Sequence, residues 1–266
     1  MKEIKNIKCF LLDMDGTIYL DNHLIDGALD FLQNLELNQK QYIFLTNNSS
    51  ENKKAYQEKL ANLGLIIDED QVFTSGEATS WYIKNLKKDA KVFLLGTPFL
   101  EEEFNKAGFT LVKSRDDKPD FFVLGFDTTL TYEKILVACD FIREGVPFIA
   151  THPDLTCPLS NGQSMPDAGA MISMFEAATG KRPQIIGKPN VFNIEVITKK
   201  YGLQKDEIAM VGDRLYTDIK MGVDAGITTF LVLTGETTLQ MYEDSTIQAD
   251  YVLGSVKDLG KLIVNY

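Results

Sequence analysis

The stretch that decides the fold of this chain is Cys9-Phe10-Leu11-Leu12-Asp13-Met14-Asp15-Gly16-Thr17. Its four consecutive apolar residues predict a strand buried on both faces, as in a parallel sheet covered by helices. The strand runs directly into two aspartates at positions i and i+2, which can point to the same side. One carboxylate could be a nucleophile and the other could carry a proton. Two close carboxylates repel each other unless a cation joins them, and ligand sets made of oxygen suit Mg²⁺. The alternative is that Asp-x-Asp-Gly is simply a turn.

Short apolar runs alternate with amphipathic stretches along the rest of the chain. This alternation predicts an α/β fold with a Rossmann-like parallel sheet. The expected strands are Cys9–Leu12, Tyr42–Leu45, Val92–Leu95, Phe121–Leu124, Phe148–Ala150, Gln184–Ile186, Ile208–Val211 and Thr229–Leu233. Helices are expected between them. In one, an apolar stripe predicts a face buried in the core, made of Tyr132, Ile135, Leu136, Cys139 and Ile142.

Composition limits the classes of protein to consider. The 266 residues are 44% hydrophobic and 24% charged, which suits packed domains rather than disorder. A net charge of −11 argues against nucleic acid or an anionic membrane as the main partner. The three cysteines form no C-x-x-C pair, and neither a signal peptide nor a membrane-length apolar segment is visible. We therefore expect a soluble cytoplasmic protein.

Polar residues follow the apolar run Tyr42–Leu45. Thr46, Asn47 and Asn48 offer a hydroxyl, amides and backbone N–H groups, which suit a phosphate, above all where a helix begins. Gly187-Lys188-Pro189 places a lysine after another expected strand, where it can neutralise a bound phosphate. Taken alone, the residues that begin at Thr46 are also explained as an N-cap cluster, and the lysine as a solvated surface charge.

Two further carboxylates follow the run Ile208–Val211. Asp213 lies at the strand end and Asp218 in the next turn, where they could complete an oxygen-rich magnesium site or merely cap a helix. The carboxyl ends of parallel strands lie at one edge of the sheet, where open α/β sheets bind ligands. The residues that we expect to converge there are Asp13, Asp15, Thr46, Lys188, Asp213 and Asp218.

In their order along the chain, these motifs resemble the four motifs of the haloacid dehalogenase (HAD) superfamily. The resemblance implies that Asp13 is the nucleophile and that Asp15 is the general acid/base. It implies that the phosphoryl group is held by Thr46, Lys188 and amides near Asn47. It implies that Mg²⁺ is held by Asp13, Asp213 and the backbone carbonyl of Asp15, with Asp218 in support. An aspartate at position 15 is typical of phosphatases and phosphomutases in this superfamily.

The spacing of the motifs leaves room for an inserted domain, because 142 positions separate Thr46 from Lys188. Superfamily members with this layout carry an α/β cap between motifs two and three. The implied division is a core at 1–80 and 182–266 with a cap at 81–181. Within the insert, Gly125-Phe126-Asp127 and Ala150-Thr151-His152-Pro153-Asp154 resemble the NagD-like, or 4-nitrophenylphosphatase-like, subfamily, although that subfamily usually has asparagine at position 152.

The resemblance implies a phosphatase for small phosphate monoesters, such as a sugar phosphate or a nucleotide, acting through a phospho-aspartate on Asp13. Within the cap, Asp127, His152 and Asp154 are the candidates to contact the leaving group. The alternative for His152 is a hydrogen-bonded loop histidine. Members of the subfamily often pair through their caps, so a homodimer through the cap is compatible with the resemblance. The alternatives are a phosphomutase and a protein that binds a phosphorylated ligand without turnover.

Overall fold

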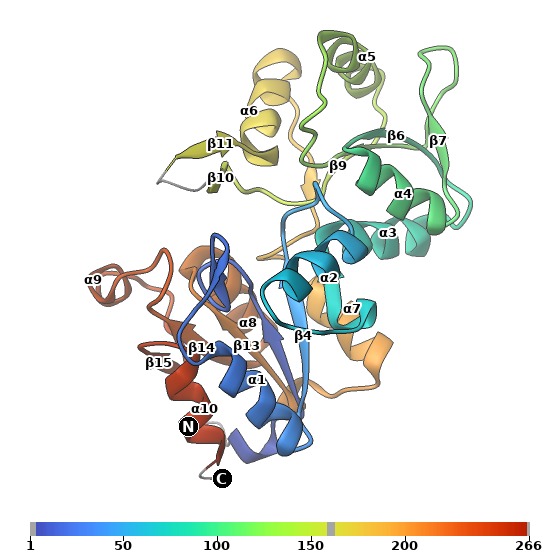
Figure 1. Cartoon of the computed structure of the whole chain (residues 1–266). Helices are drawn as coiled ribbons and strands as arrows, with labels where there is room; N and C mark the ends of the chain where they lie inside the picture. Colours follow the sequence, from blue (N-terminus) through green and yellow to red (C-terminus); the bar gives the residue numbers. More distant parts are fainter. Residues whose placement is uncertain (1–3, 159–162, 265–266) are drawn as a thin grey trace. The chain divides into compact units, whose positions relative to one another are not determined.

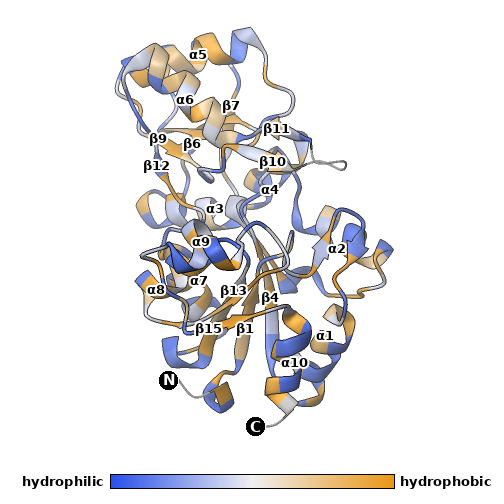
Figure 2. Ribbon diagram, turned by 90° about the vertical axis from the view of Figure 1, so that its left-hand side faces the viewer, coloured by the Kyte–Doolittle hydropathy of each residue, from blue (hydrophilic) through white to orange (hydrophobic). Residues whose placement is uncertain are grey.

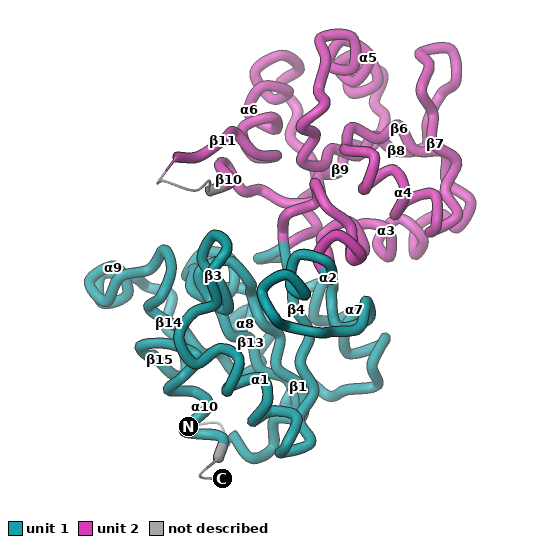
Figure 3. Tube along the Cα trace, viewed as in Figure 1, with its two compact units in different colours: residues 1–46, 57–73, 188–266 teal, residues 47–56, 74–187 magenta. Residues whose placement is uncertain are grey.

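The computed structural model describes residues 4–158 and 163–264, and these fold into two compact units (Figure 3). Among the described residues, unit 1 contains 4–46, 57–73 and 188–264, and unit 2 contains 47–56, 74–158 and 163–187. These boundaries differ from those expected from the sequence, because residues 47–56, 74–80 and 182–187 group with unit 2. The assignment of a specificity role to the insert stays a prediction.

A six-stranded sheet in the order β15-β14-β13-β1-β4-β5 forms the centre of unit 1 (Figure 1). Strand β1 is parallel to β13 on one side and to β4 on the other, and β14 and β15 continue the parallel pairing. The strands are β1 (Cys9–Leu12), β4 (Gln41–Thr46), β5 (Val72–Thr74), β13 (Ile208–Gly212), β14 (Thr228–Val232) and β15 (Tyr251–Leu253).

The register of this sheet brings three strand ends together. Leu12, the last residue of β1, pairs with Val211 of β13 and with Phe44 of β4. All four residues of β1 are fully buried, because helices cover both faces of the sheet. The polar residues that follow β1, β4 and β13 therefore emerge at the same edge.

Helices flank the sheet of unit 1, and α1 packs against α10. Figure 2 shows α1 and α10 on one side of the sheet and α7 and α8 on the other. The helices are α1 (Ala28–Leu37), α2 (Lys53–Asn62, which continues from unit 2), α7 (Phe192–Tyr201), α8 (Lys220–Ala225), α9 (Leu239–Glu243) and α10 (Val256–Val264). A short hairpin, β2 (Tyr19–Leu20) with β3 (His23–Leu24), follows β1.

Unit 2 has its own five-stranded sheet, in the order β12-β9-β8-β6-β7, and its printed strand pairs are parallel. Its aromatic core is centred on Phe122, whose ring stacks on Phe148 at 4.7 Å and meets Phe175 edge to face at 5.6 Å. The strands are β6 (Lys91–Leu95), β7 (Thr110–Val112), β8 (Phe121–Leu124), β9 (Phe148–Ala150) and β12 (Gln184–Ile185), with the hairpin β10 (Thr156–Pro158) and β11 (Ser164–Pro166). The helices are α3 (Ser75–Leu86), α4 (Pro98–Lys106), α5 (Tyr132–Arg143) and α6 (Ala168–Thr179).

The predicted α/β class with a Rossmann-like parallel core is confirmed, and each of the eight expected strands is found to within one residue at either end. The strands that the pattern missed are short. Five of them have three residues and two have two residues, too few to show a periodicity; they are β5, β7, β10, β11 and β15, and β2 and β3.

The predicted buried face of α5 is wrong in part. Tyr132 is 80% exposed and Leu136 is 38% exposed, whereas Val137 and Phe141 are buried. Apolar residues occupy a wide arc of this helix, so the pattern alone does not say which part of the arc packs on the sheet.

The helices and the cysteines bear on whether the chain has the features of a membrane or disulfide-bonded protein. In the part of the chain that the structure describes, no helix has both the length and the apolar composition that a bilayer span requires. The three cysteines, Cys9, Cys139 and Cys157, are free.

Candidate active site

The residues after β1 fold into a tight turn that presents two carboxylates. The Asp13 amide still donates to the Val211 carbonyl, so the residue continues the sheet pairing. The Met14 carbonyl then accepts hydrogen bonds from the amides of Thr17, Ile18 and Tyr19, which closes one helical turn. Gly16 has a φ of +82°, a left-handed conformation that a residue with a Cβ adopts only at a cost. Asp13 is half-buried at this turn, and Asp15 is exposed.

Lys188 lies between two aspartates at the same edge of the sheet. Its Nζ donates to Asp13 Oδ1 at 2.5 Å, to Asp218 Oδ1 at 2.7 Å and to the Leu45 carbonyl at 3.2 Å. A lysine ammonium has three hydrogens, so these three acceptors match its donors. Because the residue is only 3% exposed, its charge is held by these partners and not by water.

Asp213 completes a group of three carboxylates. One oxygen each from Asp13, Asp213 and Asp218 lies within 4.8 Å of the other two. Asp213 Oδ2 accepts a hydrogen bond from the Glu236 amide at 2.6 Å, whereas Oδ1 is buried without a hydrogen-bond partner among the described residues. A buried, unpartnered carboxylate oxygen beside two other carboxylates is the donor set that a hard divalent cation takes. The residues present therefore fit Mg²⁺.

The electrostatics of the group agree with this fit. Burial, with the neighbouring charges of Asp13 and Asp218, raises the pKa of Asp213 to about 8. Burial also raises the pKa of Asp218 to about 6, although the charge of Lys188 opposes the rise. For Lys188, burial acts to lower the pKa, but the charges of Asp13 and Asp218 outweigh it and hold the pKa above its ordinary value. Carboxylates that resist joint ionisation are the ones that a cation stabilises.

The polar residues that begin at Thr46 divide between the two units. Thr46 is the last residue of β4 in unit 1 and is nearly buried, and the chain enters unit 2 at Asn47. The Asn47 side-chain amide donates to Asp154 Oδ1 at 3.0 Å, and the Asn47 backbone carbonyl accepts from Ser75 Oγ at 2.5 Å. Asn48 Oδ1 accepts from the amide and hydroxyl of Ser50, as in a turn that precedes a helix.

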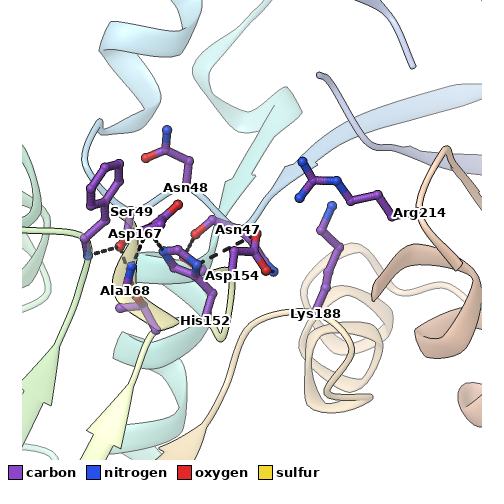
Figure 4. A network of polar contacts seen from close by, with 12 residues as sticks. Asn47, Asn48, Ser49, His152, Asp154, Asp167, Ala168, Lys188 and Arg214 are labelled. Carbon is purple, nitrogen blue, oxygen red and sulfur yellow. Dashed lines mark hydrogen bonds and ion pairs between the residues drawn. The ribbon is translucent and has the colours of Figure 1, made fainter. Parts of the chain in front are cut away.

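His152 lies in a polar network of unit 2, with a carboxylate facing each ring nitrogen (Figure 4). Its Nδ1 is 3.9 Å from Asp154 Oδ2 and its Nε2 is 3.5 Å from Asp167 Oδ1. Asp167 is the N-cap of α6 and accepts from the Ala168 amide at 2.5 Å. The imidazole is fully buried, and neither nitrogen makes a hydrogen bond within the described residues. Contact with a substrate would therefore require a conformation that uncovers this ring.

Asp127 is also engaged within unit 2. Its carboxylate pairs with Lys134 Nζ at 2.8 Å and accepts from the Thr129 amide and hydroxyl at 2.8 and 2.6 Å. The side chain has no exposed surface. These contacts organise the loop before α5. The prediction that Asp127, His152 and Asp154 contact a leaving group stays a prediction.

Comparison with known proteins identifies the family. A profile described as haloacid dehalogenase-like hydrolase matches residues 10–110, and a second HAD-like hydrolase profile matches residues 185–259. The acid sugar phosphatase of Staphylococcus haemolyticus is 37% identical over 98% of this chain and 97% of its own length. The chain is a haloacid dehalogenase-like hydrolase.

Solved structures of this hydrolase family show the same architecture. The 4-nitrophenylphosphatase of Thermotoga maritima aligns with a TM-score of 0.92 and 45% identity over 97% of this chain and 98% of its own. A putative nagD protein aligns with a TM-score of 0.91 and 43% identity over 97% and 99%. A glycerol phosphate phosphatase of Mycobacterium tuberculosis, solved in complex with magnesium, aligns with a TM-score of 0.90 and 28% identity over 98% and 79%. The expected NagD-like resemblance is confirmed, and so is the expectation of a phosphatase enzyme of the HAD type.

Four residues beside these carboxylates and Lys188 were given no individual role from the sequence. Thr17 Oγ1 lies 3.5 Å from Asp13 Oδ2, and Tyr19 Oη donates to Asp15 Oδ2 at 3.1 Å. Lys59 contacts Tyr19, and the charge of Arg214 acts to lower the pKa of Asp213. Thr17 belongs to the motif that begins at Asp13, and Tyr19 and Arg214 lie within two residues of a motif residue, so their positions in the sequence pointed to the site. Nothing in the sequence around Lys59, on α2, pointed to the site.

The crowding around Gly16 leads to a prediction about stability. A Cβ at Gly16 would lie 2.7 Å from Asp213 Oδ2, whereas a Cβ at Gly64, with a φ of +89°, meets nothing within 4 Å. Both Gly→Ala changes incur the left-handed cost of about 1–2 kcal/mol. We expect Gly16→Ala to lower the free energy of unfolding by about 1–3 kcal/mol more than the matched control Gly64→Ala, because it also overpacks the carboxylate group. Denaturant unfolding measures the free energy of unfolding of both variants. Equal losses would mean that the Asp213 side chain moves aside without cost.

Proposed function

We propose that this chain is a magnesium-dependent phosphatase that hydrolyses small phosphate monoesters through a phospho-aspartate on Asp13. The observation that carries the proposal is the group of Asp13, Asp213 and Asp218 with the buried Lys188 at one edge of the sheet. Its relatives are described as acid sugar, 4-nitrophenyl and glycerol phosphate phosphatases, which favours small phosphorylated metabolites as the substrate class.

The first half of the reaction transfers the phosphoryl group to the protein. An Asp13 carboxylate oxygen attacks phosphorus in line, and the bond between phosphorus and the leaving oxygen breaks. Asp15 gives its proton to that oxygen, so the product leaves as an alcohol. The position of Asp15 supports this role, because the residue is exposed and lies two positions from the nucleophile.

The second half regenerates the enzyme. Asp15, now a carboxylate, takes a proton from a water molecule whose oxygen attacks phosphorus, and the bond between phosphorus and Asp13 breaks. Inorganic phosphate and the free Asp13 carboxylate result. A protein that only binds phosphate has no need of this second carboxylate, and a mutase would return the group to another hydroxyl.

The cation and the phosphate oxygens have separate ligands in this proposal. Asp13, Asp213 and the backbone carbonyl of Asp15 would hold Mg²⁺, which when bound offsets the negative charge of the phosphoryl group. Lys188 and Thr46, with the backbone amides that follow Thr46, bind the phosphate oxygens. Asp218 keeps Lys188 in position, as their 2.7 Å ion pair suggests.

Unit 2 has the role of a specificity cap in this proposal. Such a cap excludes water during transfer and contacts the part of the substrate that leaves. Asp127, His152 and Asp154 are its candidate contacts, each placed after a strand of the unit 2 sheet. Nucleic acid and membrane have no place in the proposal, given the acidic balance of the chain.

Replacing the nucleophile tests the mechanism. We expect Asp13→Asn to lower the turnover of 4-nitrophenyl phosphate by about a thousandfold or more, because no other group can form the covalent intermediate. The matched control is Asp26→Asn, which removes a carboxylate from an exposed ion pair with Lys257 and should leave turnover unchanged. Release of inorganic phosphate in step with the alcohol separates a phosphatase from a mutase. Turnover of Asp13→Asn within about tenfold of the wild type would refute the assignment.

Removal of the metal tests the carboxylate group. We expect EDTA to abolish turnover and excess Mg²⁺ to restore it, because the three carboxylates need a hard cation. Calcium should inhibit, since its larger and looser coordination disturbs the in-line geometry. Full turnover in excess chelator would show that these carboxylates do not hold a cation that the reaction needs.

Substitutions in unit 2 test the cap. If His152 and Asp127 contact the leaving group, His152→Ala and Asp127→Ala should re-rank sugar, nucleotide and aryl phosphates by about tenfold or more, since one such contact is worth about 1–3 kcal/mol. The matched controls are His23→Ala, at the other histidine of the chain, and Asp117→Ala, at an exposed aspartate of unit 2. The measurement is kcat/KM over the panel. If kcat/KM falls by the same factor for every substrate, His152 and Asp127 serve only the packing of unit 2.

A further inference from the structure

Asp15 is exposed, yet its side chain is held by a buried neighbour. Tyr19 Oη donates to Asp15 Oδ2 at 3.1 Å, and Tyr19 has no exposed surface. The backbone supports the contact, because Asp15 and Tyr19 form a β-bridge and the Tyr19 amide donates to the Met14 carbonyl. The tyrosine ring is thus fixed relative to the turn that carries the aspartate.

Lys59 determines the direction of this hydrogen bond. From α2, its Nζ donates to Tyr19 Oη at 3.1 Å and lies 4.4 Å from the centroid of the ring. A lysine ammonium only donates, so the phenol oxygen must accept from Lys59. A phenol has a single hydrogen, and Asp15 Oδ2 is an acceptor at hydrogen-bond distance. The order is therefore Lys59 to Tyr19 to Asp15.

We propose that Tyr19 and Lys59 are positioning residues for the proton transfer by Asp15, an inference that rests on the function proposed above. With Oδ2 engaged by Tyr19, Oδ1 is the oxygen that carries the proton to the leaving group. The O–H bond at Oδ1 breaks as the bond from hydrogen to the leaving oxygen forms. Tyr19 and Lys59 touch neither phosphorus nor the leaving group, and act only through Asp15.

The leaving group of the substrate separates this role from simple packing. An alkoxide needs protonation to leave, whereas 4-nitrophenolate is stable without it. The value of kcat/KM reports steps up to the transfer to Asp13, so it isolates the donation of the proton. A loss of Asp15 positioning should therefore weaken turnover of glycerol phosphate more than that of 4-nitrophenyl phosphate.

Tyr19→Phe is the central variant, because it removes one hydroxyl and keeps the ring. We expect it to lower kcat/KM for glycerol phosphate about tenfold more than for 4-nitrophenyl phosphate, within the range that general acid catalysis contributes. Lys59→Met keeps an apolar stem over the ring and should shift the ratio in the same direction. Should Tyr19→Phe fail to fold, as judged by circular dichroism and thermal unfolding, Lys59→Met carries the test.

Matched controls come from unit 1. Tyr42→Phe, in β4, removes a phenol hydroxyl that donates to Glu36. Lys200→Met removes an ammonium that lies 5.1 Å from the ring centroid of Tyr201. Both should leave the ratio of the two substrates unchanged, because neither contacts Asp15.

A double-mutant cycle shows whether Tyr19 acts through Asp15. Asp15→Asn should show the same selective loss, and adding Tyr19→Phe should cost no more than about twofold beyond it. Equal losses for both substrates in Tyr19→Phe, or additive losses in the double variant, would overturn the positioning role while the phosphatase stands. A wild-type chain that hydrolyses neither substrate would overturn the proposed function and this inference together.

Discussion

A buried lysine paired with two aspartates is the interaction on which the site of unit 1 depends. Lys188 is only 3% exposed and Asp218 is fully buried, so neither charge has water as an alternative partner. Loss of one member of such a group leaves an uncompensated charge, which costs far more than a surface ion pair contributes. The two ion pairs of Lys188 therefore hold together three parts of the chain that are distant in sequence. These are the end of β1, the turn after β13 and the segment after β12.

The parallel sheet explains how an acidic chain brings a buried lysine and three carboxylates together at one edge. Apolar strands place their polar successors at one edge, and the local charge there is set by a few buried groups and not by the net charge of the protein. Crowded carboxylates raise one another's pKa, as for Asp213, and thereby favour a cation.

Unit 2 shows why residue type alone does not assign a role. His152 and Asp127 have side chains suited to reading a substrate, yet both are buried among partners of their own unit. Tyr19 and Lys59 show the reverse case, because side chains that resemble packing and surface residues in the sequence form an ordered chain of donors to Asp15. Long-range contacts decide both cases.

The sequence by itself determined the class of fold, the eight principal strands and the meeting of Asp13, Lys188, Asp213 and Asp218 at the sheet edge of unit 1. It could do so because buried parallel strands are continuous apolar runs, and because their ends must share an edge. Only the tertiary structure decided the partners of Lys188, the contact between Lys59 and Tyr19, the exposure of Tyr132, and the crossing of the chain into unit 2 at Asn47. The physical reason is that each of these depends on packing between segments far apart in the chain, and local periodicity carries no information about that packing.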